Sequence, residues 1–210
     1  MKVITLNLKD YTQLLSSDAP APGGGAASAL AGAQGMALTL MVVNLTLGKE
    51  KYADCEALCL ETKEKGEGLM AQLTAGIDKD KEAFEVLSAA YKLPKEKEEE
   101  KKCRSQGIGA ATLVATKVPI DAMTQGVDGL KLTLPLVGNS NKGAVSDLGA
   151  AAVNLLSCVK GSWLNVLINL PGIQDQTLAK ELKEKGASLL AEAEDLSKKI
   201  YAEVEKTIRG

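Results

Sequence analysis

Apolar residues recur at helical spacing over most of the chain, and proline or glycine interrupts the pattern at only a few places. The stretch 24–47 contains no charged residue and ends at Gly48, which suits the left-handed position after a helix. The stretch 50–91 carries leucine, isoleucine and phenylalanine at three- and four-residue intervals, and Pro94 follows it. Both patterns predict long helices.

Three further helices are predicted. The charged run 95–102 should form the solvated first turns of the third, because neighbouring Glu and Lys residues support each other weakly on a helix. This helix should kink or restart at Pro119, where proline removes a hydrogen bond, and Gly138-Asn139 closes it. A very apolar helix over residues 143–170 and an amphipathic one over residues 175–208 follow.

The N-terminal arm, residues 1–22, is expected to hold an extended piece over residues 3–8 and a short helix capped by Asp10. About five long helices joined by short loops predict an all-α, up-and-down bundle, with one domain over residues 1–210. The helices are apolar on more than one face, so one bundle cannot cover them and a homodimer is expected.

The composition narrows the chemistry. The net charge is −2 and basic residues are dispersed among acidic ones, so neither nucleic acid nor an anionic membrane surface is an expected partner. The absence of histidine excludes Ser-His and Cys-His pairs, imidazole acid-base catalysis and nearly every catalytic zinc site. Catalysis would have to use carboxylates, lysines or dipoles.

Cysteine usage favours a reduced, cytoplasmic setting, because no Cys-x-x-Cys pair and no signal peptide is recognised. Cys55 and Cys59 lie one helical turn apart and are interpreted as packing residues rather than metal ligands. The uncharged helix is long enough to cross a bilayer. Its Ala, Gly, Gln34 and Asn44 and its lack of basic flanks favour a buried bundle helix, and a membrane-embedded bundle is the alternative.

Two prolines and the triplet Gly23, Gly24 and Gly25 come directly before the alanine-rich helix. The first turn of this helix offers backbone N–H groups beside residues that have almost no side chain. Such a turn can bind an anion or a flat ligand closely.

Asp80 interrupts an apolar stripe of the second helix. The stripe comprises Leu73, Ile77, Phe84, Leu87 and Tyr91. Burial would raise the pKa of Asp80 and allow it to hold or give a proton near neutral pH. In the alternative, the helix is rotated slightly, and Asp80 faces water beside Asp78 and between Lys79 and Lys81.

Asp147, Asn154, Gly161 and Asn165 fall on about one side of the fourth helix. A buried polar seam needs hydrogen bonds or a ligand to satisfy it, although Asp147 would also be favourable simply as a charge near a helix N-terminus. Lys49 follows the first long helix, where a lysine is favourable in any case.

Six ordered motifs resemble the formiminotransferase-cyclodeaminase C-terminal domain and its stand-alone bacterial relatives, the methenyltetrahydrofolate cyclohydrolases among them. The motifs are Pro22-Gly-Gly-Gly25, Asn44-Leu-Thr-Leu-Gly48-Lys49, Asp78-Lys-Asp80-Lys-Glu-Ala-Phe84, Tyr91-Lys-Leu-Pro94, Gly138-Asn139 followed by Ser146-Asp147, and Leu164-Asn165-Val-Leu-Ile-Asn169-Leu. The resemblance covers essentially the whole chain.

The resemblance implies a homodimeric helical bundle with a folate site near the subunit contact, in which Asp80 is the catalytic residue. It implies no metal and no organic cofactor, because the tetrahydrofolate derivative is the substrate. On this hypothesis the substrate-binding residues are Gly23, Gly24, Gly25, Ser28, Asn44, Lys49 (or Lys51), Asn139, Asp147 and Asn165.

Two activities are implied for such a chain. A methenyltetrahydrofolate cyclohydrolase adds water to the methenyl carbon, whereas a formiminotetrahydrofolate cyclodeaminase releases ammonia to form the same methenyl compound. The cyclohydrolase is slightly favoured, since the motifs include nothing of the transferase module. A non-catalytic helical dimer, in which Asp80 is ion-paired, is the distant alternative.

Overall fold

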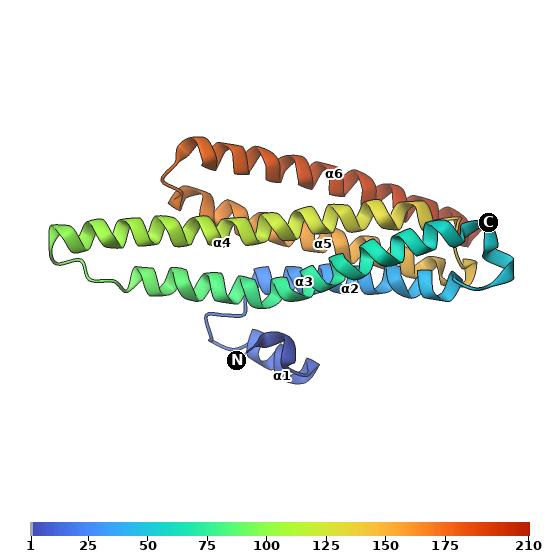
Figure 1. Cartoon of the computed structure of the whole chain (residues 1–210), viewed down its shortest axis with the longest axis horizontal. Helices are drawn as coiled ribbons and strands as arrows, with labels where there is room; N and C mark the ends of the chain where they lie inside the picture. Colours follow the sequence, from blue (N-terminus) through green and yellow to red (C-terminus); the bar gives the residue numbers. More distant parts are fainter. Residues whose placement is uncertain (1) are drawn as a thin grey trace.

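The structure, a computed structural model, describes residues 2–210 and contains only helices and connecting turns in that range. Figure 1 shows five long helices lying side by side and a short one beneath them. They are α1 (Leu8–Leu15), α2 (Gly24–Thr46), α3 (Glu56–Tyr91), α4 (Glu98–Thr133), α5 (Val145–Asn169) and α6 (Gln176–Arg209).

From α2 to α6 the chain reverses direction at every connection, so the predicted all-α, up-and-down bundle is confirmed (Figure 1). Helix α2 packs against α3 on one side and α5 on another, while α6 lies on α5 and α4. Small residues bring α2 and α5 close together. A Cβ on Gly32 would lie 2.8 Å from Cys158 Sγ, and one on Gly35 would lie 2.7 Å from Leu155 Cγ.

The predicted helix ends are mostly confirmed. Helix α2 stops at Thr46, and Gly48 adopts a positive φ of 71°. Asp175 caps α6 by accepting hydrogen bonds from the backbone N–H groups of Thr177 and Leu178. The second predicted helix begins later than expected, because a 3-10 segment with a kink at Tyr52 occupies Glu50–Cys55 before α3 starts.

Of the two outcomes expected at Pro119, a kink or a restart, the restart is wrong, since α4 continues as one helix from Glu98 to Thr133. Proline cannot donate to the carbonyl four residues earlier, that of Ala115. The side chain of Asn169 on α5 donates to this oxygen instead, at 2.9 Å. A long-range hydrogen bond therefore satisfies the group that Pro119 leaves free.

The N-terminal arm also differs from its prediction. Val3–Thr5 forms a 3-10 turn rather than an extended piece. Asn7, not Asp10, caps α1, because the Asn7 side chain accepts the backbone N–H of Asp10 at 2.9 Å. Asp10 still contributes, since its carboxylate accepts from Asn7 Nδ2 at 2.8 Å.

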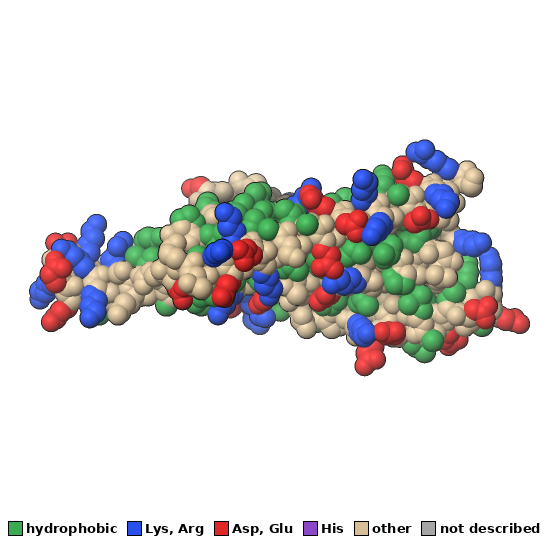
Figure 2. Space-filling model, turned by 90° about the horizontal axis from the view of Figure 1, so that it is seen from above, with side chains coloured by type: hydrophobic (Ala, Val, Ile, Leu, Met, Phe, Trp, Pro, Cys, Tyr) green, Lys and Arg blue, Asp and Glu red, His purple; other side chains and the backbone are tan. Residues whose placement is uncertain are grey.

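Charges of both signs are intermingled on the face in Figure 2, with a mixed cluster at one end of the elongated molecule. The segments Gly24–Thr46 and Lys142–Gly172 are long and apolar enough to cross a membrane, by length and composition alone. In the first of them, 61% of the most apolar window is buried inside the bundle. Burial against α3 and α5 thus accounts for the uncharged character of α2.

Candidate active site

Asp80 lies at the point where the middle of α3 passes the first turn of α2. The backbone N–H of Ala26 donates to Asp80 Oδ2 at 2.9 Å. A Cβ on Gly25 would lie 2.0 Å from Asp80 Oδ1, so only glycine leaves room for the carboxyl at this position. The glycine-rich turn is thus built to receive a side chain of its own chain.

The protonation of Asp80 is set by two opposing effects. Burial raises the pKa of Asp80 above its ordinary value, and the hydrogen bond from Ala26 lowers it. Burial is the larger effect, so the carboxyl holds its proton at a higher pH than a free aspartate does. A carboxyl in this state can serve as a general acid or base without histidine.

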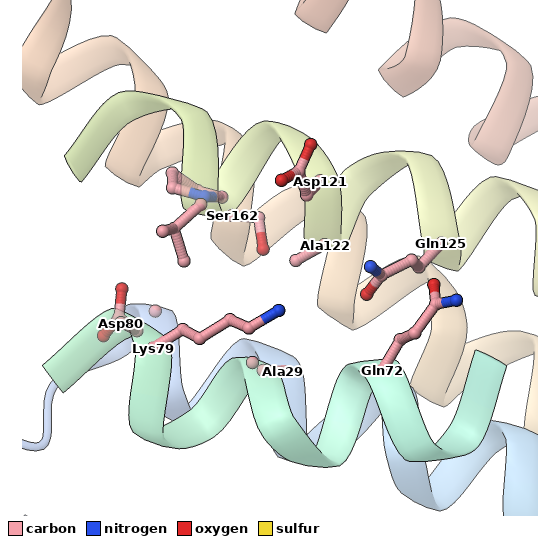
Figure 3. Close-up of a pocket in the computed structure, with 12 residues that line it drawn as sticks. Ala29, Gln72, Lys79, Asp80, Asp121, Ala122, Gln125 and Ser162 are labelled. Atoms are coloured by element: carbon pink, nitrogen blue, oxygen red, sulfur yellow. The ribbon is translucent and has the colours of Figure 1, made fainter. Parts of the chain in front are cut away.

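Asp80 borders a narrow cleft that α2, α3, α4 and α5 enclose, named the Asp80 cleft below. Figure 3 shows the residues that line it. They are Gly25, Ala29, Gln72, Gly76, Lys79, Asp80, Val118, Pro119, Asp121, Ala122, Gln125 and Ser162. The cavity volume is about 40 Å³, which is room for one or two water molecules. Gln72 also lines a wider groove of about 590 Å³ between α3 and α4.

Five predicted binding residues lie at this end of α2, namely Gly23, Gly24, Gly25, Ser28 and Asn165. Ser28 donates to the Gly24 carbonyl at 2.6 Å. Asn165 of α5 donates to the Gly161 carbonyl at 2.9 Å, and its Nδ2 is 3.6 Å from a Cβ placed on Gly24. The amide of Asn165 keeps its carbonyl oxygen available for a ligand.

With this geometry in place, known proteins provide a comparison. The sequence model of the formiminotransferase-cyclodeaminase family matches residues 7–188. The chain belongs to this family. The expected resemblance is therefore confirmed over most of the chain.

The relatives of this chain carry the names of two different activities, a cyclohydrolase and a cyclodeaminase. The chain is 39% identical to the methenyltetrahydrofolate cyclohydrolase of Methylorubrum extorquens, covering 96% of this chain and 97% of that one. It is 33% identical to the formimidoyltransferase-cyclodeaminase of Sus scrofa, over 89% of this chain and 34% of the longer relative. A crystal structure of formiminotetrahydrofolate cyclodeaminase from Thermotoga maritima superposes with a TM-score of 0.88 at 30% identity, covering 99% and 100% of the two chains.

Four other predicted binding residues of this family member lie at the opposite end of the bundle. Asn44 and Lys49 are exposed near the end of α2, Asn139 is exposed after α4, and Asp147 is half-buried in the first turn of α5. The 23 residues of α2 separate the two ends by roughly 30 Å. One chain therefore does not bring these four residues to Asp80.

Polar residues of the Asp80 cleft were missed by the sequence analysis. Figure 3 shows Gln72 of α3 and Gln125 of α4 reaching toward each other across the cleft, and Lys79 extending along it. A usable signal was present. Gln72 and Lys79 share a helical face with Gly76, and Asp121 and Gln125 are one turn apart in an otherwise apolar part of α4.

The predicted apolar stripe around Asp80 is only half correct. Leu73 and Ile77 are buried, as expected, whereas Phe84 is 40% and Tyr91 is 54% exposed. Beyond Asp80, α3 runs past the start of α2 and loses the neighbour that would bury these residues (Figure 1). The alternative in which Asp80 faces open water is also wrong, because the carboxyl is half-buried against α2.

Asp78 is the buried acid of the segment Asp78-Lys-Asp80, and it does not line the cleft. Its Oδ1 accepts hydrogen bonds from the backbone N–H groups of Val3 at 2.6 Å and Ile4 at 3.4 Å. Among residues 2–210, no group of three or more His, Cys, Asp or Glu side chains is placed to hold a metal ion.

Proposed function

We propose that this family member is a methenyltetrahydrofolate cyclohydrolase in which Asp80 moves the proton. The observation that carries the proposal is the carboxyl itself: it is half-buried, held by a backbone N–H at 2.9 Å, raised in pKa by burial, and placed at a cleft. A chain without histidine has few other groups that can exchange a proton near neutral pH.

In the proposed reaction, water adds to the methenyl carbon between nitrogen 5 and nitrogen 10, and one proton of the water is released. The resulting tetrahedral carbon loses its bond to nitrogen 5, which takes up a proton from Asp80 as it departs. The hydroxyl on this carbon gives up its own proton as the C=O bond forms, and the carbon stays on nitrogen 10 as a formyl group. Asp80 is then reprotonated, so one water is consumed and one proton is released overall, because the methenyl substrate carries a positive charge.

The cleft carries little net charge. Asp80 holds its proton in the proposed reaction, and the lining otherwise includes one acid, Asp121, and one basic residue, Lys79. A cavity of about 40 Å³ is smaller than a pterin ring needs, so the Gln72, Gln125 and Lys79 side chains must move apart on binding. The wider groove that shares Gln72 could hold the rest of the ligand.

The choice between the two activities rests on similarity. The cyclohydrolase relative is 39% identical over nearly the whole of both chains. The alternative, a formiminotetrahydrofolate cyclodeaminase, is supported by the Thermotoga maritima structure, which matches equally completely at 30% identity. Both reactions pass through a tetrahedral carbon flanked by nitrogen, so one carboxyl could serve either.

The test uses both substrates separately. Incubation with methenyltetrahydrofolate should bleach the methenyl absorbance without ammonia, at a rate well above the spontaneous hydrolysis. Incubation with formiminotetrahydrofolate should leave the absorbance flat. Growth of the methenyl absorbance together with ammonia would replace the cyclohydrolase by the cyclodeaminase, and inactivity in both would overturn the proposed function.

We further infer a homodimer that shares its folate sites. The outer face of α2 and α5 is apolar and has no helix of this chain over it. Its large exposed side chains are Met41, Leu45, Val153, Leu164 and Ile168, each 39% to 77% exposed. Two copies packed antiparallel on this face would bring the Asn44, Lys49, Asn139 and Asp147 end of one chain to the Asp80 end of the other.

Mixed dimers test this arrangement. Differently tagged Asp80→Asn and Asp147→Asn chains are coexpressed and the hybrid is purified with both tags. Sites built from two chains leave one complete site in the hybrid, so about half of the wild-type activity should return. An inactive hybrid, or a monomer by light scattering, would contradict the shared site.

A further inference from the structure

The N-terminal arm packs on the same turn of α2 that binds Asp80. Val3 and Tyr11 are buried in a small core with Ala26, Ala29 and Ile77. Ala26 is the residue whose N–H holds the Asp80 carboxyl. The arm and the candidate catalytic group therefore both contact one residue of this turn, Ala26. Figure 1 shows α1 beneath the region where α2 begins.

A carboxylate holds the arm in place. Asp78 Oδ1 accepts the backbone N–H of Val3 at 2.6 Å and that of Ile4 at 3.4 Å. Apolar packing beneath the arm is looser, because a hollow of about 210 Å³ remains there. Its lining comprises Val3, Ile4, Leu6, Leu8, Tyr11, Leu30, Ala33, Thr74 and Ile77. The bond from Asp78 is thus a principal tie between the arm and α3.

Tyr11 couples the arm to Asp80 electrostatically. Burial raises the pKa of Tyr11, and the negative charge of Asp80 raises it further. The Tyr11 hydroxyl is buried without a hydrogen-bond partner among the described residues. Its ring therefore packs as an apolar group, in the small core with Val3, Ala26 and Ala29.

Few other charges face Asp80. Helix α2 has no titratable side chain, and α5 contributes the uncharged Ser162 to the cleft. Helix α4 contributes Asp121, α3 contributes Lys79, and the arm contributes Tyr11. Burial, rather than a neighbouring charge, is hence the main influence on the pKa of Asp80.

We propose that the N-terminal arm is a positioning element of the active site, held closed by Asp78, that keeps water from the Asp80 carboxyl. Releasing the arm would hydrate Asp80 and loosen the α2 turn that orients it. Hydration favours the charged form, so less Asp80 would carry a proton at neutral pH. This inference rests on the proposed role of Asp80.

The experiment uses two disruptive variants: Asp78→Ala removes the hydrogen bond that holds the arm, and Tyr11→Ala removes the aromatic ring that packs beneath it. They are compared with the conservative variants Asp78→Asn and Tyr11→Phe. Asp78→Asn keeps an oxygen that can accept the Val3 N–H, and Tyr11→Phe keeps the ring. Glu67→Ala, an exposed position of α3, is the matched control. The readouts are the pH profile of kcat and the carbon-13 carboxyl titration of Asp80, assigned from Asp80→Asn.

Both alanine variants should lower the pKa of Asp80 and reduce kcat at neutral pH about tenfold, with KM changed less than about threefold. The conservative variants should stay near wild type. The inference is overturned if the Asp80 titration is unchanged in Asp78→Ala while amide exchange at Val3 proves the arm free. It is also overturned if Tyr11→Phe loses as much activity as Tyr11→Ala.

Tyr11→Ala keeps the test decisive if Asp78→Ala fails to fold, because it leaves the bond between Asp78 and the Val3 N–H in place. The carboxyl titration needs no substrate, so it tests the arm even if the proposed reaction is wrong. Full turnover by Asp80→Asn would instead overturn the proposed function and leave the arm's effect on the carboxyl measurable.

Discussion

The two ends of α2 use polar groups in opposite ways. At the N-terminal end, the Ala26 N–H meets the carboxyl of Asp80, which is half-buried and borders a cleft. At the C-terminal end, Thr46 accepts the backbone N–H of Asn141 at 2.9 Å, and Asn141 Nδ2 donates to the Leu45 carbonyl at 3.1 Å. One end holds a group ready to exchange a proton, whereas the other is closed by its own hydrogen bonds.

The closed end continues into a small network. Asn141 Oδ1 accepts from the Gly143 N–H at 3.0 Å and from the Tyr52 hydroxyl at 3.3 Å. Each of these groups fixes the connection between α4 and α5 or the kink after α2. The comparison shows how to sort polar residues at a helix end. A residue whose side chain still has a free donor, acceptor or exchangeable proton is a functional candidate, whereas one whose hydrogen-bonding groups all have partners within the protein is a structural residue.

The strongest test of the comparison is Asp80→Asn. The amide keeps the shape and can still accept the Ala26 N–H, but it cannot move a proton. We expect kcat to fall about 10²–10⁴-fold, with the fold retained by circular dichroism. Steady-state turnover of methenyltetrahydrofolate measures it, and near wild-type kcat with folate still bound would remove Asp80 from the mechanism.

Gly25→Ala should have the next largest effect. The new Cβ would lie 2.0 Å from Asp80 Oδ1, so the carboxyl must move by an ångström or more. Displacement of this size should lower kcat about 10²-fold. Gly107→Ala is the control, because its Cβ would meet only the Leu93 side chain, at 3.3 Å, and Gly107 lines neither the Asp80 cleft nor the wider groove. That variant should keep its activity and change the free energy of unfolding by less than about 1 kcal/mol.

At the closed end, Asn141→Ala should affect stability rather than chemistry. It leaves the Leu45 carbonyl, the Gly143 N–H and the Tyr52 hydroxyl without this partner, so urea unfolding should show a loss of about 1–3 kcal/mol. Asn139→Ala is the counterpart, because that exposed amide bonds only the Pro135 carbonyl. It should barely alter unfolding and should raise KM if Asn139 contacts folate.

The smallest expected effect is the dependence of stability on pH. Burial holds the pKa of Asp80 above its ordinary 3.8, so the folded chain retains a proton that the unfolded chain releases. The free energy of unfolding therefore falls as the pH rises from below 3.8 through the raised pKa of Asp80. Wild type and Asp80→Asn should match near pH 3.5 and diverge as pH rises, with the variant the more stable. Urea midpoints from pH 3.5 to 8 test this, and a constant difference would show that Asp80 ionises normally.

Sequence reasoning was most successful where local chemistry decides the structure. The lack of charge over residues 24–47 and the glycine after them located α2, and Asp175 marked the start of α6. It failed at Pro119, because Asn169, 50 positions away, supplies the missing hydrogen bond. A distant partner leaves no periodic trace in a single sequence.

The same division holds in the site. The position of Asp80 in a helical stripe, joined to the family resemblance, selected the carboxyl from sequence. Its hydrogen bond to Ala26 and the cleft residues Gln72 and Gln125 emerged only when the helices were packed. Asn44, Lys49, Asn139 and Asp147 were assigned together from motifs, yet one chain places them at the far end of the bundle.

The sequence alone therefore determined the helices and the all-α class, since spacing and composition are local properties, and its resemblance to the family singled out Asp80 as the candidate proton carrier. The tertiary structure decided which of two neighbouring aspartates binds the N-terminal arm and which one lies at the cleft. Asp78 and Asp80 stand two residues apart, and α3 directs one toward the N-terminal arm and the other toward α2. Burial and hydrogen-bond partners distinguish the two carboxyls, and these arise only from the packing of segments distant in the chain.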